Sequence, residues 1–237
     1  MKKRTIVLLI AVVLIAGAIY YFENSKVKIT ETNEENQTIG ESSTQERQSS
    51  YKDKLYQIAP ELKGIVGYIN TEKNIKISDF KGKVVLIDFW TYTCINCIRT
   101  LPYLTQWDAK YRDKGLVIIG VHTPEFEFEK DYSNVKAAVE KYNIKYAVVQ
   151  DNNRGTWNAY NNRFWPRKYL IDADGYIRYD HIGEGGYQET ELKIQQELKT
   201  INSSFGPQAL ESDNGGKNMV CSPTTPEYYL GYARGSY

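Results

Sequence analysis

The sequence predicts an α/β domain with a mixed central sheet, and three observations point to that fold class. Mostly apolar runs rich in β-branched residues, at 84–89, 116–121 and 146–149, are typical of strands covered on both faces. Stretches with helical spacing separate these runs, as in parallel strands joined by crossover helices. Two further strands joined by a tight turn follow near the end of the domain, which makes the predicted sheet mixed.

The helices are predicted from their apolar positions. The first helix follows the run at 84–89, and its apolar stripe, which core packing explains without a ligand, consists of Ile98, Leu101, Leu104, Trp107 and Tyr111. A second helix is expected at 131–142, and an amphipathic helix at 189–201 closes the domain. The glycines at 183–186 indicate a turn into this last helix.

The predicted hairpin lies between the second and the last helix. Residues 168–171 and 176–181 have the composition of strands, and Ala173-Asp174-Gly175 between them favours a tight turn. This turn is too short to be a calcium-binding loop.

The chain begins with a candidate membrane segment at residues 1–22. Three basic residues at 2–4 precede an uncharged apolar stretch that would be roughly 27 Å long as a helix, close to the ~30 Å hydrocarbon core. The basic flank would keep the amino terminus in the cytoplasm. A transmembrane anchor and a cleaved signal sequence, with Ala16-Gly17-Ala18 as the cleavage site, both fit, and both export the domain.

Polar segments flank the predicted domain, which we place at 55–205. Residues 23–54 are dense in Glu, Asn, Gln, Ser and Thr and cannot bury enough apolar surface to fold, so we expect a disordered linker. Residues 206–237 are rich in Gly, Pro, Ser, Asn and Asp and include Cys221. They form either a partly ordered tail or the opening of a further module.

Composition excludes several classes of function. Thirty Lys and Arg residues stand against 29 Asp and Glu residues, for a formal net charge of +1, so no basic field favours nucleic acid as a partner. Two histidines are too few for a multinuclear metal site, and three cysteines are too few for a disulfide-stapled small domain. The remaining chemistry is centred on the cysteines.

Cys94-Ile95-Asn96-Cys97 lies directly after the predicted strand at 84–89 and at the start of the first helix. This junction places Cys94 beside unpaired backbone N–H groups and the positive end of the helix dipole, which favours the thiolate. Cys97 lies one turn further on, close enough to form a disulfide. We therefore assign Cys94 as the attacking sulfur and Cys97 as the resolving sulfur.

Two other uses of the cysteine pair are weighed against redox exchange. A zinc site needs about four ligands, and the spacing of Cys221, His122 and His181 fits no zinc module. A purely structural disulfide that closes so short a loop would add little stability. Redox exchange explains the motif best, and it requires neither a metal nor another cofactor.

Further motifs surround the cysteine pair. Asp88-Phe89-Trp90 precedes it, Pro102 follows it in the helix, and Trp165-Pro166 comes just before the predicted hairpin. Together with the string at 89–99, these motifs resemble the thioredoxin-like superfamily, and within it the TlpA-like branch and the exported domain of DipZ-type proteins. The resemblance covers residues 59–201. It implies a thioredoxin-like fold, with a mixed central sheet flanked by helices.

The cysteine pair has a candidate proton partner in Asp88. Burial in an apolar strand should raise the pKa of this carboxyl group and suit it to exchange a proton with Cys97. The alternative is a structural carboxylate held by backbone donors. His122 and Glu125, which follow the strand at 116–121, are interpreted as structural.

Four residues are candidates for substrate binding. The resemblance implies that Pro166 is cis and presents neighbouring backbone groups to an extended substrate, with Trp165 beside it; a trans turn proline is the alternative. Trp90 and Tyr92 would form an apolar rim for the substrate, or would only pack in the core.

The chain also departs from the family pattern. Ile95-Asn96 replaces the Gly-Pro of thioredoxin, and Thr93 stands where thioredoxin has tryptophan, so thioredoxin's potential does not transfer. DipZ-type proteins carry an electron-transferring membrane domain before this one. Here the segment at 1–22 takes its place, so we expect an unidentified electron donor in the membrane.

These features predict a membrane-tethered, extracytoplasmic thiol–disulfide oxidoreductase. Its partners would be exported proteins, whose disulfides it reduces, because Asp88 beside the pair opposes the stable thiolate on which a strong oxidant depends. The alternatives are a thiol peroxidase of the same fold and a redox-inert adaptor for metal or haem delivery.

Overall fold

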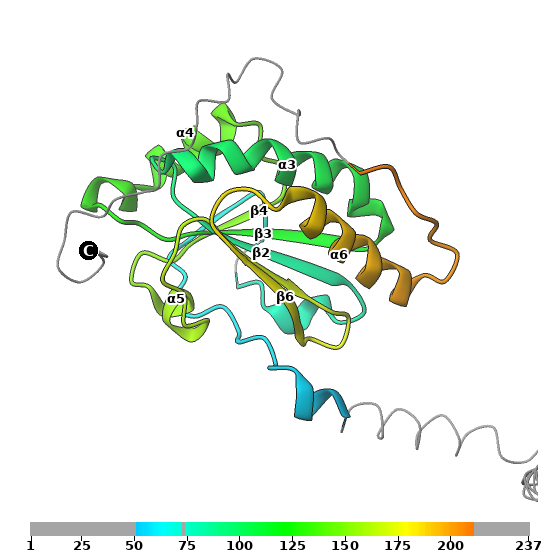
Figure 1. Ribbon diagram of the computed structural model, residues 1–237. Helices are drawn as coiled ribbons and strands as arrows, with labels where there is room; N and C mark the ends of the chain where they lie inside the picture. Colours follow the sequence, from blue (N-terminus) through cyan, green and yellow to red (C-terminus); the bar gives the residue numbers. More distant parts are fainter. Residues whose placement is uncertain (1–50, 73, 211–237) are drawn as a thin grey trace, which may run out of the picture. The chain divides into compact units, whose positions relative to one another are not determined.

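A six-stranded sheet forms the centre of the computed structural model, which describes residues 51–72 and 74–210 (Figure 1). The strands are β1 (Gly67–Ile69), β2 (Val84–Trp90), β3 (Leu116–His122), β4 (Ala147–Gln150), β5 (Arg167–Ile171) and β6 (Ile177–Ile182). Their order across the sheet is β1-β4-β3-β2-β5-β6. The β2–β3 and β3–β4 pairs are parallel, and the other three pairs are antiparallel. The predicted mixed sheet is confirmed.

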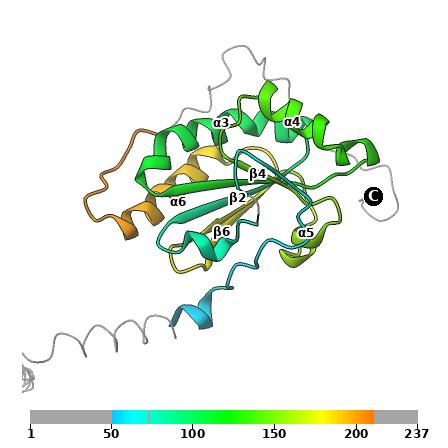
Figure 2. The ribbon, with the colours of Figure 1, turned by 180° about the vertical axis from the view of Figure 1, so that it is seen from behind.

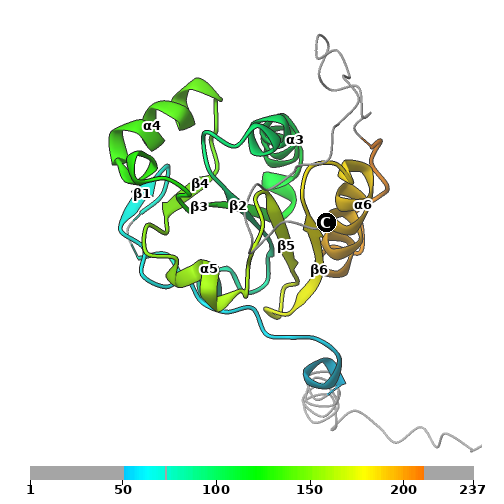
Figure 3. The same cartoon turned by 60° about the vertical axis from the view of Figure 1, so that its left-hand side comes forward.

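Helices cover both faces of this sheet. The α-helices are α3 (Ile95–Tyr111), α4 (Tyr132–Lys141), α5 (Gly155–Ala159) and α6 (Tyr187–Ile201), and the 3₁₀ helices are η1 (Ile77–Phe80), η2 (Arg112–Lys114) and η3 (Glu127–Lys130). α3, α4 and α6 lie on one face and α5 on the other, as the views from the front, from behind and from the side show (Figures 1, 2 and 3). This is the layered architecture of an α/β domain.

β2 lies between β3 and β5 in the sheet, and all seven of its residues are buried. Successive side chains of a strand point to opposite faces. Phe89 therefore faces the aromatic cluster formed with Trp157, Tyr160 and Tyr169, while Asp88 faces the side that α3 covers. The strand thus carries one carboxyl group into the layer beneath the active-site helix.

The long predicted elements are all present, whereas several short ones were not predicted. β1 has three residues and α5 has five, too few to show a strand or helix period. Gly155 opens α5 because a Cβ atom there would lie 2.6 Å from the carbonyl oxygen of Lys63. The three 3₁₀ helices are equally short and have no period of their own.

The two turns predicted at 173–175 and 183–186 adopt backbone conformations that glycine allows. In the β5–β6 hairpin, the Asp172 carboxylate accepts hydrogen bonds from the backbone N–H groups of Asp174 and Tyr176, and Gly175 has a left-handed backbone with φ of 99°. Gly186, with φ of 59°, begins α6. The turn predicted at 183–186 is therefore confirmed.

The predicted linker at 23–54 ends too late. Residues 51–55 are helical, and the Lys52 ammonium pairs with the carboxylates of Asp172, at 2.8 Å, and Asp174. These long-range ion pairs attach residues before 55 to the hairpin, which composition alone does not reveal.

The predicted tail also begins inside the folded region. The amide of Gln195 donates to the carbonyl oxygen of Gln208, and the Gln208 N–H donates back to Gln195. The segment at 1–22, most of the linker, and the tail beyond 210 lie outside the described residues. Within residues 51–72 and 74–210, no helix is both long enough and apolar enough to span a bilayer.

Candidate active site

The two cysteines lie where β2 passes into α3. Cys94 is the N-cap of the helix and is half-buried, whereas Cys97 is 1% exposed. The backbone N–H of Cys97 donates to Cys94 Sγ at 3.3 Å. The two cysteines lie one turn apart at the start of the same helix. The outer sulfur can meet a substrate, and the inner one can react only with its neighbour.

The two cysteines also differ in their electrostatic environments. Burial raises the pKa of the Cys97 thiol well above its ordinary value, and the nearby Cys94 and Asp88 raise it further. Cys94 instead receives a backbone N–H at the positive end of the helix, which stabilises a thiolate. Cys97 therefore needs a base before it can attack.

Asp88 is a candidate for that base. Its residue is 1% exposed, and burial raises the pKa of the carboxyl group to about 7, against a smaller lowering by the positive charge of Lys168. Its Oδ1 has no hydrogen-bond partner among the described residues. A carboxyl group with a pKa near neutrality can both accept and return a proton at physiological pH.

Lys168 is a buried charged residue near the pair that the sequence interpretation missed. It lies directly opposite Asp88 in the β2–β5 ladder, which puts both side chains on the same face, and it is fully buried. Its ammonium donates to the carbonyl oxygen of Gly183 at 3.4 Å. Burial lowers the pKa of Lys168, while the charges of Asp88, Cys97 and Glu184 oppose that change. The signal available in the sequence was a lysine directly before the apolar residues 169–171 of a predicted strand.

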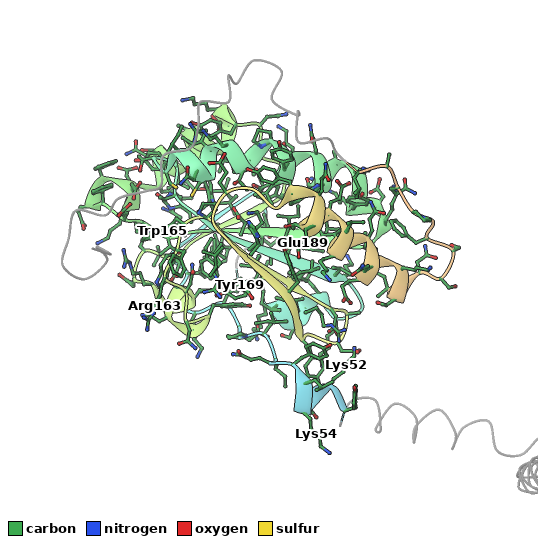
Figure 4. All side chains as sticks on the ribbon, in the orientation of Figure 1. Lys52, Lys54, Arg163, Trp165, Tyr169 and Glu189 are labelled. Carbon is green, nitrogen blue, oxygen red and sulfur yellow. The ribbon has the colours of Figure 1, made fainter. Side chains whose placement is uncertain are left out.

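The four candidate substrate-binding residues lie in different environments. Trp90 is completely buried, and Trp165 is 8% exposed, so both are core side chains here. Trp165 packs on Trp157 and its indole N–H donates to Thr123, at the end of the domain away from Lys52 (Figure 4).

Tyr92 and Pro166 differ from the two buried tryptophans. The Trp165–Pro166 peptide bond is cis, as the resemblance implied. Tyr92 is half-buried, and its ring stacks on that of His122 at 5.6 Å. Of the expected apolar rim, Tyr92 alone retains exposed surface, because Trp90 belongs to the core.

A second buried carboxylate, Glu129 of η3, contacts the chain just before Cys94. It accepts hydrogen bonds from the Thr93 hydroxyl and from the backbone N–H groups of Glu125 and Phe126, the last two at 2.6 and 2.9 Å. Burial would raise the pKa of Glu129, but these donors hold it below its ordinary value. The sequence did not reveal Glu129, because its contact with the cysteine-bearing segment comes from Thr93, 36 residues earlier in the chain.

His122 has the structural surroundings expected of it. It is fully buried, and its Nε2 lies 3.3 Å from the Thr91 hydroxyl. Burial lowers its pKa to about 4, so the ring is neutral at physiological pH. Across the described part of the chain, His, Cys, Asp and Glu side chains form no group of three or more that could hold a metal ion.

The chain is similar to known redox proteins in sequence. A sequence model of the Redoxin family matches residues 59–196. Protein DipZ of Mycobacterium tuberculosis is 43% identical over 178 residues, which cover 74% of this chain but only 26% of DipZ. Thiol-disulfide oxidoreductase ResA of Bacillus cereus is 30% identical over 150 residues, covering 63% of this chain and 82% of ResA.

The fold is also similar to a solved structure. The solution structure of a thioredoxin-like protein in the oxidized form superposes with a TM-score of 0.57 and 28% sequence identity. The match covers 62% of this chain and 98% of that protein. The similarity to this thioredoxin-like protein therefore extends well beyond the cysteine motif.

Proposed function

The chain belongs to the Redoxin family, with a thioredoxin-like fold, and on this premise we propose that it is a membrane-tethered thiol–disulfide oxidoreductase that reduces disulfides in exported proteins. One observation carries the proposal. Cys94 caps α3 and is only half-buried, so a substrate can approach it. Cys97 is buried one turn further on, near the Asp88 carboxyl group, whose pKa is raised to about 7.

In the first step, the Cys94 thiolate attacks one sulfur of a substrate disulfide. A mixed disulfide forms between Cys94 and that sulfur, and the other substrate sulfur leaves as a thiolate and takes up a proton. The N–H of Cys97, which donates to Cys94 Sγ, stabilises the attacking anion.

In the second step, Cys97 resolves the mixed disulfide. Asp88 accepts the Cys97 proton, and the new thiolate attacks Cys94 Sγ, which releases the second substrate thiol. Two electrons have then passed to the substrate, and the protein holds a Cys94–Cys97 disulfide. Asp88 returns its proton to the solvent or to the leaving thiolate, and no other redox group takes part.

The proposed location and partners rest on the residues before the folded domain. The basic residues at 2–4 and the apolar stretch up to 22 support an anchor with the domain outside the cytoplasm, joined by a polar linker. Reduction of exported proteins then needs a membrane electron donor to regenerate the two thiols. DipZ and ResA are the relatives whose similarity favours this setting.

Substrate contacts are proposed at Pro166 and Tyr92. A cis peptide before Pro166 leaves the adjacent backbone groups to pair with an extended substrate strand. Tyr92 would add an apolar contact beside Cys94. Trp165 would hold the Pro166 segment in place through its hydrogen bond to Thr123.

The sulfur assignment is tested by alkylation of the reduced full-length protein with iodoacetamide near pH 7. We expect Cys94 to react far faster than Cys97, because Cys97 is buried and its thiol pKa is raised. Comparable rates, or a faster Cys97, would overturn the assignment. In parallel, Cys97→Ser should trap a mixed disulfide with a disulfide peptide, and Cys94→Ser should not.

The same preparations separate the rival functions. A thiol peroxidase would show rapid, saturable oxidation by hydrogen peroxide and slow exchange with disulfide peptides. An adaptor without redox activity would keep its function in the Cys94→Ser/Cys97→Ser variant. We expect disulfide exchange to be the faster reaction and the double variant to be inactive.

A further inference from the structure

Two phenylalanines next to the active site are exposed to solvent. Phe126 and Phe128 are 52% and 56% exposed, and their rings stack with centroids 5.6 Å apart and planes 3° apart. The ring of Tyr92 lies 6.5 Å from that of Phe128. We call these three residues the aromatic shelf. Exposed apolar clusters of this kind mark interaction sites more often than single exposed side chains do.

The shelf is connected directly to the segment that carries the attacking cysteine. The Tyr92 hydroxyl donates to the carbonyl oxygen of Phe128 at 3.3 Å, and the Thr93 hydroxyl donates to the Glu129 carboxylate. Cys94 is the next residue along the chain. The shelf therefore adjoins the segment that carries the attacking cysteine.

The loop beneath the shelf is fixed by polar contacts. The buried Glu129 carboxylate accepts two backbone N–H groups of its own loop. The Asn134 side chain donates to the carbonyl oxygen of Phe128 at 3.1 Å, and the Asn152 side chain donates to that of Lys130 at 3.1 Å. The rings are thus held outward by a hydrogen-bonded support, rather than exposed on a loose loop.

The charges around the shelf are mostly negative. Glu125, Glu127 and Asp131 are exposed carboxylates, whereas Lys130 is the one basic residue between 125 and 131, and it pairs with Glu127 at 2.7 Å. A partner with basic residues is therefore favoured over an acidic one.

A cavity adjoins the shelf on the side of Phe126. Its volume is about 230 Å³, and its lining includes Phe126, Pro124 and Arg154. The Arg154 guanidinium lies 5.3 Å from the ring of Trp165, which precedes the cis proline. Arg154 thus contacts both this cavity and the residue before the cis proline.

We propose that the aromatic shelf binds a polypeptide segment of the substrate that carries an aromatic side chain and a basic residue close to its reactive cysteine. This inference rests on the proposed function, since Cys94 chemistry brings the substrate to this place. The aromatic side chain stacks on Phe126 and Phe128, and the basic side chain meets the carboxylates and the ring faces. The shelf thereby selects among protein disulfides that Cys94 could otherwise attack equally.

The test compares three disulfides as substrates of the reduced full-length protein. Two are peptides of equal length with one disulfide, flanked either by Phe and Lys or by Gly and Ser; the third is hydroxyethyl disulfide, which is too small to reach the shelf. The variants are Phe126→Ser, Phe128→Ser and the double variant. Leu192→Ser is the matched control, because Leu192 is an exposed apolar residue, 44% exposed, on α6.

We expect the double variant to lose about tenfold in kcat/KM for the Phe-Lys peptide, mainly through KM, as for loss of one aromatic anchor. Its rates with the Gly-Ser peptide and hydroxyethyl disulfide should match those of the wild type, as should all rates of Leu192→Ser. Phe128→Leu should lose less kcat/KM for the Phe-Lys peptide than Phe128→Ser does, because leucine keeps an apolar side chain at this position. An unchanged preference for the Phe-Lys peptide would overturn the proposal. Failure of the wild type to reduce hydroxyethyl disulfide would instead overturn the proposed function.

Two other occupants of the shelf are separable outcomes. A second copy of this chain would give a dimer that the double variant loses in sedimentation. A lipid surface would give stronger binding of the full-length protein to anionic vesicles, and the double variant would lose that added binding. Either result, without a change in peptide preference, contradicts the proposal. Raised salt should weaken selection of the Phe-Lys peptide and leave hydroxyethyl disulfide unaffected.

Discussion

Asp88 and Glu129 are both buried carboxylates near the cysteine-bearing segment, yet their environments are opposite. Asp88 Oδ1 has no hydrogen-bond partner among the described residues, and burial raises the pKa of this group to about 7. Glu129 is at least as buried, but a hydroxyl and two backbone N–H groups donate to it, and its pKa is lowered.

The difference shows how burial and hydrogen-bond donors together decide the pKa of such a carboxyl group: burial dominates at Asp88, and donors dominate at Glu129. Asp88 is free to change its protonation state and can serve the resolving thiol. Glu129 stays ionised and ties η3 to the residue before Cys94. We therefore propose Asp88 as the proton acceptor, whereas Glu129 connects η3 to the residue before Cys94.

The strongest test of this contrast replaces the proton acceptor. Asp88→Asn should slow resolution of the mixed disulfide at pH 7 by about 10²–10⁴-fold, the usual contribution of a general base, and leave the first attack by Cys94 nearly unchanged. Rapid mixing with a chromogenic disulfide separates the two steps. Asp108→Asn is the control, since Asp108 is a buried carboxylate of α3 paired with Arg112. If both steps are unchanged in Asp88→Asn, the carboxylate is only structural.

The same variant should be more stable than the wild type at and above neutral pH. A carboxyl group with a folded pKa of about 7 and an ordinary value of 3.8 binds more protons in the folded state between these values, so wild-type stability falls as pH rises across that window. Removing the ionisable group should recover up to roughly 4 kcal/mol at pH 8, and little at pH 3. Urea unfolding at both pH values measures this, and an equal effect at both would contradict it.

Glu129→Gln should act on stability instead of proton transfer. The amide presents an NH₂ group to donors that now bind a carboxylate, so we expect a loss of about 2 kcal/mol at pH 7. Because the folded pKa is lowered, the stability that Glu129 gives exists above its unfolded pKa and disappears as pH falls through the folded one. The deficit measured by urea unfolding should therefore shrink in acid. A changed pH profile of resolution would contradict the structural role.

Lys168→Met should raise the pKa of Asp88, because Lys168 lies opposite Asp88 on the neighbouring strand β5. Loss of the positive charge that lowers the pKa of Asp88 should move the midpoint of the resolution pH profile upward by about one unit. Arg167→Met is the matched control, because Arg167 is the adjacent residue and pairs with Asp180 instead. A midpoint that stays in place, or moves equally in the control, would show that Lys168 has no influence on the base.

The smallest effect is expected at Cys221, which lies outside the described residues. Cys94 and Cys97 complete the cycle between them, so Cys221→Ala should turn over a disulfide peptide at the wild-type rate. Steady-state assays with an excess of a small reductant measure this. A clear loss of turnover would make the carboxy-terminal segment part of the mechanism.

The sequence indicates the parts of this site that are local. Asp88 stands out because its neighbours in the strand are apolar, and the Cys94–Cys97 spacing at a strand-to-helix junction predicts unequal sulfurs. The long strands and helices are predictable for the same reason, because each carries its own period.

The parts that depend on distant contacts are not predictable in this way. Lys168 acquires its meaning from a ladder that places it opposite Asp88, and Glu129 from a hydroxyl 36 residues earlier in the chain. Trp90 is part of the core because both faces of β2 are covered, so its adjacency to the motif is misleading as a sign of substrate contact.

The reduction potential of the Cys94–Cys97 pair tests the proposed reductase most directly. The buried carboxylate of Asp88 opposes negative charge at the pair, which disfavours the stable thiolate that makes a strong oxidant. Equilibration of the full-length protein with a series of glutathione buffers should give a value nearer to thioredoxin, at about −270 mV, than to DsbA, at about −120 mV. A value above about −180 mV, the level of protein disulfide isomerase, would contradict a reductase.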